Sequence, residues 1–449
     1  MPVSRAHAES DRFPAISDET RRLQERAHRL IPGGAHTYAK GDDQYPVAAP
    51  PFIVRGKGCH VWDADGNEFI EYGMGLRAVA LGHAFPRVVE AARRELEHGS
   101  NFVRPSPIEV ACAERFLDCV RTADMVKFTK NGSDATTAAV KLARAATGRD
   151  LVAICSDQPF FSTDDWFIGA TPMPAGVPDA IRRLTVTFKF NDLPGLEALF
   201  QEHKDRISCV VLEAETSLAP QPGYHDGVRR LCDAYGVLLV LDENITGFRW
   251  DIGGAQKVHG IRPDLACFGK AIANGFALSA LCGRRELMEL GGLNTSAERV
   301  FLLSTTHGAE THALAASVAT LETYQSEPVI ETLRRQGERL RTGVNQAIAA
   351  NGLDGFVEIL GRPCNLVFAT RDRDRRPSQP LRALFMQELI RRGIIGPSFV
   401  VSYSHTDADI DRTIAAAAEA LVTYRRALDE GPDGFLVGRP LKPVFRPRV

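Results

Sequence analysis

The sequence lacks long apolar runs, a strong net charge and an apolar leader. Its apolar stretches, such as Val237–Leu241, have the length of a β-strand and fall far short of the roughly 20 residues of a membrane span. Lys and Arg number 54 against 56 Asp and Glu, so the net charge of −2 offers no bulk attraction to nucleic acid or an anionic membrane. Residues 1–30 are rich in Arg, Glu and Asp, unlike a secretory signal. We therefore expect a cytoplasmic protein with no nucleic-acid or membrane partner.

The cysteines also lack the spacing of a metal site. The nine are scattered, and no two are spaced as C-x-x-C. Their number is odd, and a chain of 449 residues does not need disulfides to stabilise its core. We expect reduced thiols and no bound metal.

The chain length predicts two or three domains. Residues 17–30 are typical of a polar helix, and residues 52–72 alternate apolar and polar side chains around an Asp-Gly pair, as in a β-hairpin. We assign this helix and hairpin to an N-terminal segment, residues 1–83, that is part of a small domain. Residues 84–320 form a large domain, and residues 321–449 form the C-terminal, α+β part of the small domain.

Short apolar strands alternate with helices through the large domain. Because strands buried on both faces and separated by helices are typical of parallel sheets, we predict an α/β fold with a mostly parallel central sheet and helices on both faces. The expected helices are 107–120, 134–146 and 227–235, and the expected strands are 125–128, 209–212, 237–241 and 265–268. Residues 309–350 predict one long helix.

The segment Lys127–Thr136 has the pattern of a strand, a turn of small residues and an Ala-rich helix. Ser133 is the expected N-cap of that helix. The first-turn amides of a helix lack partners within it, so this turn is suited to bind a phosphate. Alone, however, Ser-Asp at a helix start more often indicates only a cap.

An acid and a lysine follow two further predicted strands. Asp242 comes directly after Val237–Leu241, and Lys270 lies 28 residues later, just beyond the strand 265–268. Open α/β sheets bind ligands at the carboxyl ends of their strands. A lysine in such a cleft can have a lowered pKa and attack a carbonyl group. Each residue alone is more simply a solvated loop charge, but together with the phosphate turn they match the needs of one cofactor.

That cofactor is pyridoxal phosphate. Its phosphate needs an amide-rich turn, its pyridine nitrogen needs an acid that keeps it protonated, and its aldehyde needs a lysine to form a Schiff base.

An ordered series of motifs then extends along the chain. The series is Arg55–Gly58, Trp62–Gly66, Leu81–His83, Asn131–Thr136, Asp242-Glu243 with Thr246–Arg249, Pro263-Asp264, Phe268–Lys270 and Ser404–Asp407. In these motifs residues 30–425 resemble the class III, fold-type I aminotransferases, and among them the group around glutamate-1-semialdehyde 2,1-aminomutase. The resemblance implies the fold of a fold-type I pyridoxal phosphate-dependent transferase.

The resemblance also implies roles for individual residues. Lys270 corresponds to the lysine that binds the cofactor and moves the substrate proton, and Asp242 to the partner of the pyridine nitrogen. The remaining cofactor contacts implied are Gly132 and Ser133 in the phosphate turn, Phe160 stacked on the ring (or its neighbour Phe161), Glu213 near the phenolic edge and Thr306 on the phosphate of the neighbouring subunit. Because Thr306 would contact the cofactor of the other subunit, the resemblance also implies a homodimer in which each subunit completes the active site of its partner.

Several positions depart from the family pattern. Asn244 stands where an aliphatic residue usually meets the second face of the ring. The segment His36–Gln44 lacks the arginine with which the aminomutase grips its substrate carboxylate, and it offers Lys40 instead. Arg77 stands at the family's substrate entrance, where an exposed structural arginine and an anion grip are about equally expected.

These observations lead to three hypotheses. The first is a ping-pong aminotransferase that moves nitrogen from an amino acid donor to a polar ketone or aldehyde acceptor, in amino-sugar, polysaccharide or specialised metabolism. The second is an aminomutase that moves the amino group within one substrate. The third, an inactive fold, is disfavoured because an abandoned site has no reason to keep both Lys270 and Asp242.

Overall fold

The computed structural model describes residues 13–158 and 160–444, which form two compact units. The larger unit contains residues 77–79 and 86–330, and the smaller contains residues 13–76, 80–85 and 331–444. The predicted domain limits stay a prediction, although the limit at residue 320 falls inside helix α12 (Thr311–Ser326).

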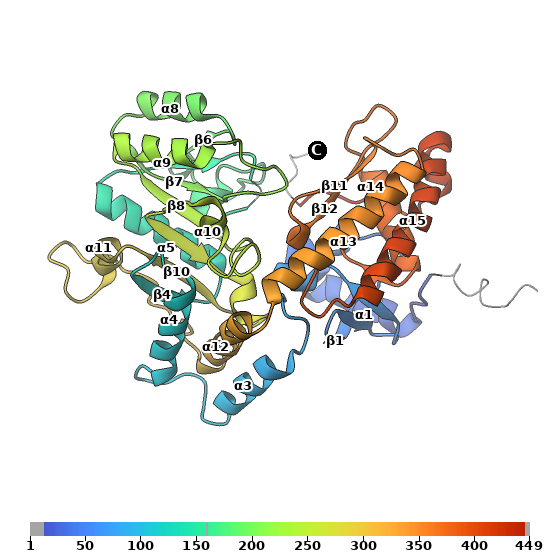
Figure 1. The fold of residues 1–449 in the computed structure, drawn as a ribbon, viewed down its shortest axis with the longest axis horizontal. Coiled ribbons are helices and arrows are strands. Elements are labelled where there is room, and N and C mark those ends of the chain that lie inside the picture. Colours follow the sequence, from blue (N-terminus) through green and yellow to red (C-terminus); the bar gives the residue numbers. More distant parts are fainter. Residues whose placement is uncertain (1–12, 159, 445–449) are drawn as a thin grey trace, which may run out of the picture. The chain divides into compact units, whose positions relative to one another are not determined.

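A seven-stranded sheet forms the centre of the larger unit (Figure 1), in the order β4-β10-β9-β8-β7-β5-β6. All neighbours in the row from β9 to β6 are parallel, and only β10 is antiparallel to β4 and β9. Every residue of β5, β7, β9 and β10 is buried, which explains their continuous apolar sequence. The strands are β4 (Met125–Thr129), β5 (Leu151–Cys155), β6 (Thr185–Phe188), β7 (Ile207–Leu212), β8 (Leu238–Glu243), β9 (Leu265–Phe268) and β10 (Ser279–Gly283).

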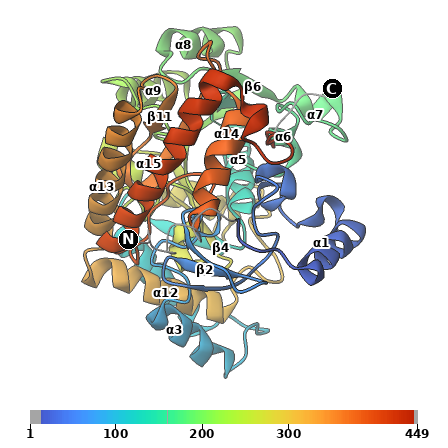
Figure 2. The same cartoon turned by 90° about the vertical axis from the view of Figure 1, so that its right-hand side faces the viewer.

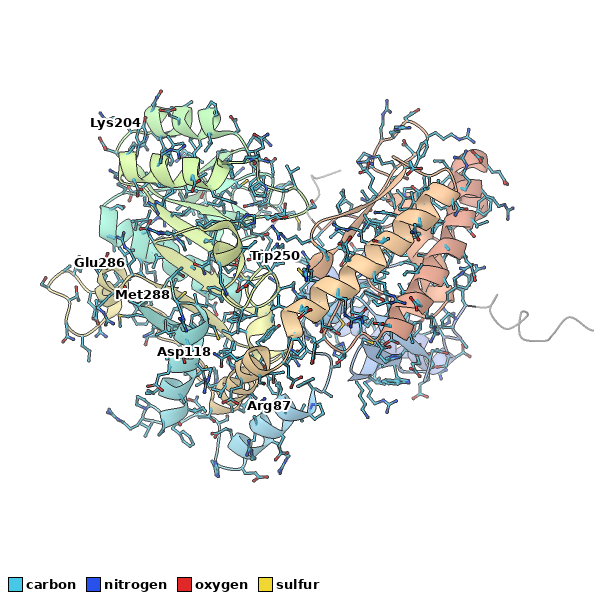
Figure 3. The ribbon with its side chains drawn as sticks, in the orientation of Figure 1. Arg87, Asp118, Lys204, Trp250, Glu286 and Met288 are labelled. Carbon is cyan, nitrogen blue, oxygen red and sulfur yellow. The ribbon has the colours of Figure 1, made fainter. Side chains whose placement is uncertain are left out.

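Helices pack on this sheet and on one another. Helix α5 crosses β4, β10, β9, β8 and β7, whereas α9 packs against β8 and α8. Helices α3, α4 and α12 pack together, and Arg87 of α3, labelled in Figure 3, pairs with Glu322 of α12 at 2.7 Å. The predicted α/β fold with a mostly parallel sheet is confirmed. The remaining bounds are α3 (Pro86–Leu96), α4 (Pro107–Cys119), α5 (Gly132–Thr147), α6 (Asp165–Ile168), α7 (Asp179–Arg182), α8 (Leu193–Glu202), α9 (Tyr224–Tyr235), α10 (Ala255–His259) and α11 (Arg285–Met288).

The smaller unit combines two small sheets with long helices. One sheet has the order β1-β2-β3-β13 and the other pairs β11 with β12. Helices α13, α14 and α15 lie side by side (Figure 2), and Arg339 of α13 pairs with Asp411 of α15 at 2.7 Å. The elements are α1 (Asp18–Leu30), β1 (Ile53–Lys57), β2 (His60–Asp63), β3 (Glu68–Glu71), β11 (Val357–Leu360), β12 (Val367–Thr370), α13 (Val329–Ala350), α14 (Gln379–Arg391), β13 (Ile394–Ile395) and α15 (Asp407–Glu430).

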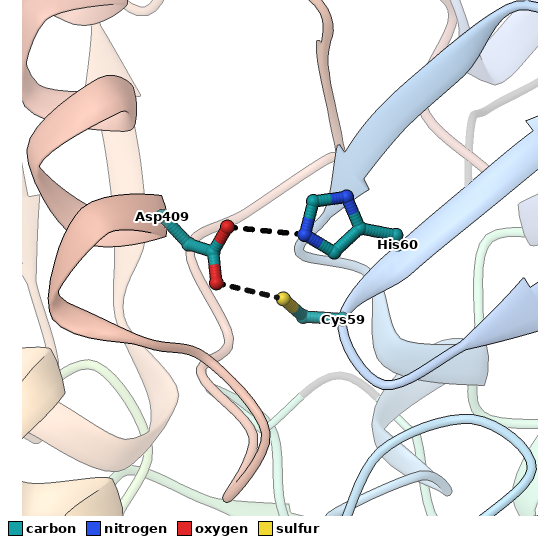
Figure 4. Close-up of side chains that lie close together, drawn as sticks. All are labelled: Cys59, His60 and Asp409. Carbon is teal, nitrogen blue, oxygen red and sulfur yellow. Dashed lines mark hydrogen bonds and ion pairs between the residues drawn. The ribbon is translucent and has the colours of Figure 1, made fainter.

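The turn between β1 and β2 is tied to the start of α15 by three side chains (Figure 4). Asp409 lies 3.4 Å from the Cys59 thiol and 3.0 Å from His60 Nε2, and it also accepts hydrogen bonds from the backbone and hydroxyl of Thr406. The ligand atoms of Cys59, His60 and Asp409 lie within 4.8 Å of one another, close enough to share a metal ion. The four hydrogen bonds to Asp409 nevertheless explain the cluster as a structural contact that anchors α15.

Two local predictions need revision. The predicted hairpin around the Asp-Gly pair is present as β2 and β3, but residues 52–72 contain a third strand as well: β1 joins β2 through a turn at Gly58, whose φ of 61° favours glycine. The single helix predicted over 309–350 is wrong: α12 ends at Ser326 and α13 begins at Val329. Pro328 lies between them and has no N–H to continue a helix. Among the helices of the described residues, none is both long and apolar enough to cross a membrane.

Candidate functional site

The parallel strands bring the predicted acid and lysine to the same edge of the sheet. Asp242 pairs with Cys267 across β8 and β9, three residues before Lys270. Glu213 directly follows β7, the other neighbour of β8. Asp242 and Glu213 are 3% and 5% exposed, and both interact electrostatically with Lys270. The edge therefore holds two buried acids and an amine on three adjacent strands.

Burial shifts the ionisation of all three groups. Burial raises the pKa of Glu213 to about 8, and the charge of Asp242 adds to this rise. Burial also raises the pKa of Asp242, against the opposing effects of Lys270 and of hydrogen bonds from Asn244. The pKa of Lys270 is lowered by burial. A lowered pKa leaves more of the amine neutral, which is the form that attacks a carbonyl group.

The backbone at Lys270 is held in an uncommon conformation. Its φ is 47°, in the left-handed region that most residues with a side chain avoid. It begins the short helical turn η5 (Lys270–Ala273), directly after β9. Residues held in such conformations concentrate at functional sites. The sharp turn takes the chain out of the strand at the lysine itself.

Asn244 connects the acid to the two neighbouring chain segments. Its backbone N–H and its side-chain Nδ2 both donate to Asp242 Oδ1, at 2.8 and 2.7 Å. Its carboxamide fills the space beside Gly132 and Gly269, where a Cβ on either glycine would overlap it. The start of α5 and the residue before Lys270 therefore both contact the residue that holds Asp242.

The start of α5 differs by two residues from the prediction. Its N-cap is Asn131 rather than Ser133, because Asp134 Oδ2 accepts the Asn131 N–H at 3.0 Å and closes the first turn. Gly132 and Ser133 are thus the first two helical residues, whose amides have no partner within a helix. The Ser133 hydroxyl accepts the N–H of Thr163 at 3.1 Å.

The aromatic pair Phe160-Phe161 has one exposed and one buried ring. Phe161 is 1% exposed and packs against Phe167 with ring centroids 5.7 Å apart, whereas Phe160 is 42% exposed. A ring already enclosed in the core has no free face for a ligand. Phe160 thus stays the predicted stacking residue.

Gln158 is a site residue that the sequence analysis missed. It is 5% exposed, its Nε2 donates to the Glu213 carbonyl at 2.7 Å, and its Oε1 accepts the Glu213 N–H at 2.8 Å. It follows β5 by three residues, so the signal used for Asp242 and Lys270, a polar residue just past a buried strand, could have found it.

A second missed residue, Arg249, supports Arg77. Arg249 is 1% exposed, and its Nη2 donates to the Arg77 carbonyl at 2.6 Å. Arg77 ends a left-handed turn, α2 (Met74–Arg77), with a φ of 71°. Burial and, to a lesser extent, the nearby charge of Arg249 lower the pKa of Arg77 to about 10, against the opposing effect of Glu213. Arg77 is therefore a cation beside Glu213, built into the same unit as Lys270.

Two predicted residues are exposed. Thr306 lies before α12, and its carbonyl accepts a hydrogen bond from Asn101 Nδ2 at 3.1 Å. Lys40 belongs to the smaller unit. Both stay predictions. Trp250, labelled in Figure 3, follows Arg249 and is 7% exposed, so it is a core aromatic.

The residues at this edge fit pyridoxal phosphate. Asp242 accepts both hydrogen bonds from Asn244 on Oδ1, which leaves Oδ2 for a ring nitrogen. Gly132 and Ser133 offer first-turn amides for a phosphate, and Lys270 offers an amine. The close contact of Gly132 with Asn244 keeps the amides and the acid at one edge.

Comparisons with known proteins agree with this fit. The sequence matches the family Aminotransferase class-III over residues 38–395. A glutamate-1-semialdehyde 2,1-aminomutase from Syntrophobacter fumaroxidans is 33% identical over 430 residues, covering 91% of this chain and 98% of that protein.

Two solved structures are also similar. FumI from Sphingopyxis sp. MTA144, solved with pyridoxal phosphate, has a TM-score of 0.84 and 28% identity, covering 94% of this chain and 100% of that chain. An omega-transaminase from Sphaerobacter thermophilus has a TM-score of 0.81 and 26% identity, covering 91% and 98% of the two chains. The name of the relative from Syntrophobacter fumaroxidans supports the hypothesis of an aminomutase better than the hypothesis of an aminotransferase with a polar acceptor.

Proposed function

Because the chain belongs to the class-III aminotransferase family, we propose that it moves an amino group with pyridoxal phosphate held at the edge of its parallel sheet. The observation that carries the proposal is the meeting of a buried acid, Asp242, and the amine of Lys270 beside the first turn of α5. Pyridoxal phosphate, when bound, supplies an aldehyde that takes up the amino group and a ring that withdraws electrons from the substrate carbon.

Each residue of the site then has a defined task. Lys270, whose pKa is lowered by burial, would hold the cofactor as a neutral amine and would move the substrate proton. Asp242 would accept the ring N–H through Oδ2. The first-turn amides of Gly132 and Ser133 would bind the phosphate, aided by the positive end of α5. Phe160 would cover one face of the ring.

Arg77 is the residue of the larger unit best suited to bind the substrate's carboxylate. Its guanidinium is always charged, and it lies in the electrostatic neighbourhood of Glu213 and Lys270. Glu213, with its pKa raised to about 8, is protonated at neutral pH and does not neutralise that cation. A carboxylate on the substrate therefore finds a positive partner here, and Lys40 is a further cation proposed for the same role.

An aminomutase reaction is the better supported of two activities. The relative from Syntrophobacter fumaroxidans carries that name and matches nearly its whole length. Transfer between two substrates is the second candidate. It is favoured by the missing arginine in His36–Gln44 and by the likeness to solved transaminases. The acceptor in that case is a polar ketone or aldehyde.

A substrate experiment separates the two activities. The protein loaded with pyridoxal phosphate is mixed with glutamate 1-semialdehyde alone, and separately with a panel of amino acids, while the cofactor absorbance and the products are followed. The aminomutase proposal expects the isomer with the amino group moved, with no keto acid released. Keto acid released from an amino acid, with no isomerisation, would favour the transaminase. No absorbance change with any compound would contradict amino-group chemistry altogether.

We further propose that two copies of the chain complete each other's sites. Thr306 is exposed, and Asn101, which binds its carbonyl, precedes the exposed apolar side chains of Phe102 and Val103. Val103 is 99% exposed and Phe301, five residues before Thr306, is 70% exposed. Apolar groups left this open favour burial by a second copy, which would bring the hydroxyl of Thr306 to the phosphate of its partner.

A further inference from the structure

Asn244 makes two hydrogen bonds to a single oxygen of the catalytic acid. Both its backbone N–H and Nδ2 donate to Asp242 Oδ1. Asn244 is 6% exposed, and its own Oδ1 has no hydrogen-bond partner among the described residues. The side chain is thus turned so that its donor serves Asp242, at the cost of leaving a buried acceptor unsatisfied.

The carboxamide also has little freedom to turn elsewhere. A Cβ on Gly132 would lie 2.7 Å from Asn244 Cγ, and one on Gly269 would overlap Asn244 Oδ1. The φ of Gly269 is −168°, which any residue can adopt, so this glycine is needed for space and not for its backbone freedom. The two glycines therefore pack closely against the Asn244 carboxamide and restrict its orientation.

The two donors change how Asp242 shares a proton. In a hydrogen bond between a ring nitrogen and a carboxylate, the proton lies on the more basic partner. Donors to the carboxylate stabilise its ionised form and make it less basic. Burial, the largest effect on Asp242, raises its pKa and so opposes these donors, as Glu213 and Glu243 do when ionised, whereas Lys270 acts with the donors.

We propose that Asn244 is a positioning residue that acts through Asp242: it occupies one carboxylate oxygen, leaves the other to the cofactor, and so keeps the proton on the ring nitrogen. The inference rests on the proposed function, because it needs pyridoxal phosphate in the site. It adds that a polar residue at this position sets the strength of the ring as an electron acceptor.

The test measures the protonation of the ring nitrogen directly. The protein is loaded with pyridoxal phosphate labelled with ¹⁵N, and the ¹⁵N chemical shift is compared between the wild type, Asn244→Leu and Asn244→Asp. Leucine keeps the size of the side chain without its donor, and aspartate keeps the shape but faces Asp242 with an oxygen. A hydrogen bond to a charged group changes proton affinity roughly 10- to 100-fold. We expect a protonated nitrogen in the wild type and a shift toward the neutral form in both variants.

A second readout separates positioning from packing. The rate of the first half-reaction should fall at saturating substrate in both variants, with the KM for the donor little changed. Asn351→Leu, which removes a side-chain amide whose Nδ2 donates to the Ala347 carbonyl at the end of α13, is the control and should keep the wild-type shift.

Three outcomes overturn the inference. One is a wild-type ¹⁵N shift in both variants at full cofactor occupancy. Another is a neutral ring nitrogen in the wild type itself. The third is failure of both variants to hold the cofactor, since Asn244 would then build the site and not tune it. Failure of the wild type to take up the cofactor would instead contradict the proposed function.

Discussion

Replacing Gly269 with alanine tests whether the site depends on the space that this residue leaves. Gly269 directly precedes Lys270, and its extended backbone accepts alanine without strain. The added Cβ would overlap Asn244 Oδ1 and lie 2.7 Å from Ser279 Oγ. Asn244 is held by Asp242, and Ser279 is 2% exposed at the start of β10, so neither neighbour can simply move aside.

The expected magnitude has two parts. Inserting a methyl group into a packed interior typically costs about 1–3 kcal/mol of folding free energy. The remaining effect is functional, because relief of the overlap must shift either Asn244 or the chain that carries Lys270. A displacement of about 1 Å at a reacting group can cost roughly 100-fold in rate. Gly269→Ala should therefore fold, lose a measurable part of its stability, and react far more slowly.

Urea unfolding and the single-turnover rate with an amino donor measure the two parts. Gly434→Ala is the matched control, because a Cβ there meets nothing within 4 Å. Adding Asn244→Ala to Gly269→Ala should restore part of the lost stability, since it removes the nearer of the two obstacles. A Gly269→Ala variant with the urea midpoint and the single-turnover rate of the wild type would show that the site does not depend on this space.

Four further predictions follow from the same geometry. Lys270→Ala should leave no cofactor attached to the protein after borohydride reduction, and a retained covalent link would exclude this lysine as the attachment point. Asp242→Asn should bind the cofactor but lose at least about 100-fold in rate, because a neutral amide cannot hold the ring nitrogen protonated; turnover at the wild-type level would remove Asp242 from the mechanism. The Glu213 contribution to the unfolding free energy should fall as pH rises from about 4.5 to about 8, because the folded state holds the Glu213 proton over that window and the unfolded state does not. Urea unfolding of the wild type and of Glu213→Gln at pH 5 and 8.5 measures this contribution. The variant should lose less unfolding free energy between the two pH values, and an equal loss in both proteins would contradict the raised pKa of Glu213. Mixed subunits of Lys270→Ala and Thr306→Ala should recover part of the activity, because one site of each mixed dimer is then intact; subunit exchange without recovery would exclude shared sites.

Much of the fold could be predicted because its signals are local. A buried parallel strand is a short apolar run, and β7, β8 and β9 all begin and end within two residues of their predicted limits. The residues after such runs, Asp242 and Lys270, indicate a site because parallel strands share one functional edge. These inferences need no knowledge of which strand lies beside which.

The missed features depend on contacts across the sheet. Gln158 binds the backbone of Glu213 because β5 and β7 are neighbours, although β6 and α8 separate them in sequence. Arg249 serves Arg77 from 172 residues away. The N-cap at Asn131 was missed for a different reason: Ser133 is as good a cap by type, and only the bond that the Asn131 N–H donates to the Asp134 carboxylate favours the earlier residue.

The site contains residues whose conformation or burial costs folding free energy, and separate hydrogen bonds hold Asp242 and Arg77. Lys270 and Arg77 have left-handed backbones, which cost about 1–2 kcal/mol each, and Asp242 is a buried acid. Asn244 holds Asp242, while Arg249 holds Arg77 through its carbonyl. The hydrogen bonds that hold Asp242, the proposed cofactor acid, therefore share no atom with the one that holds Arg77, the proposed substrate cation. Under the proposed function, a change at Arg77 should then alter which substrate is bound while Asp242 and its support keep their geometry.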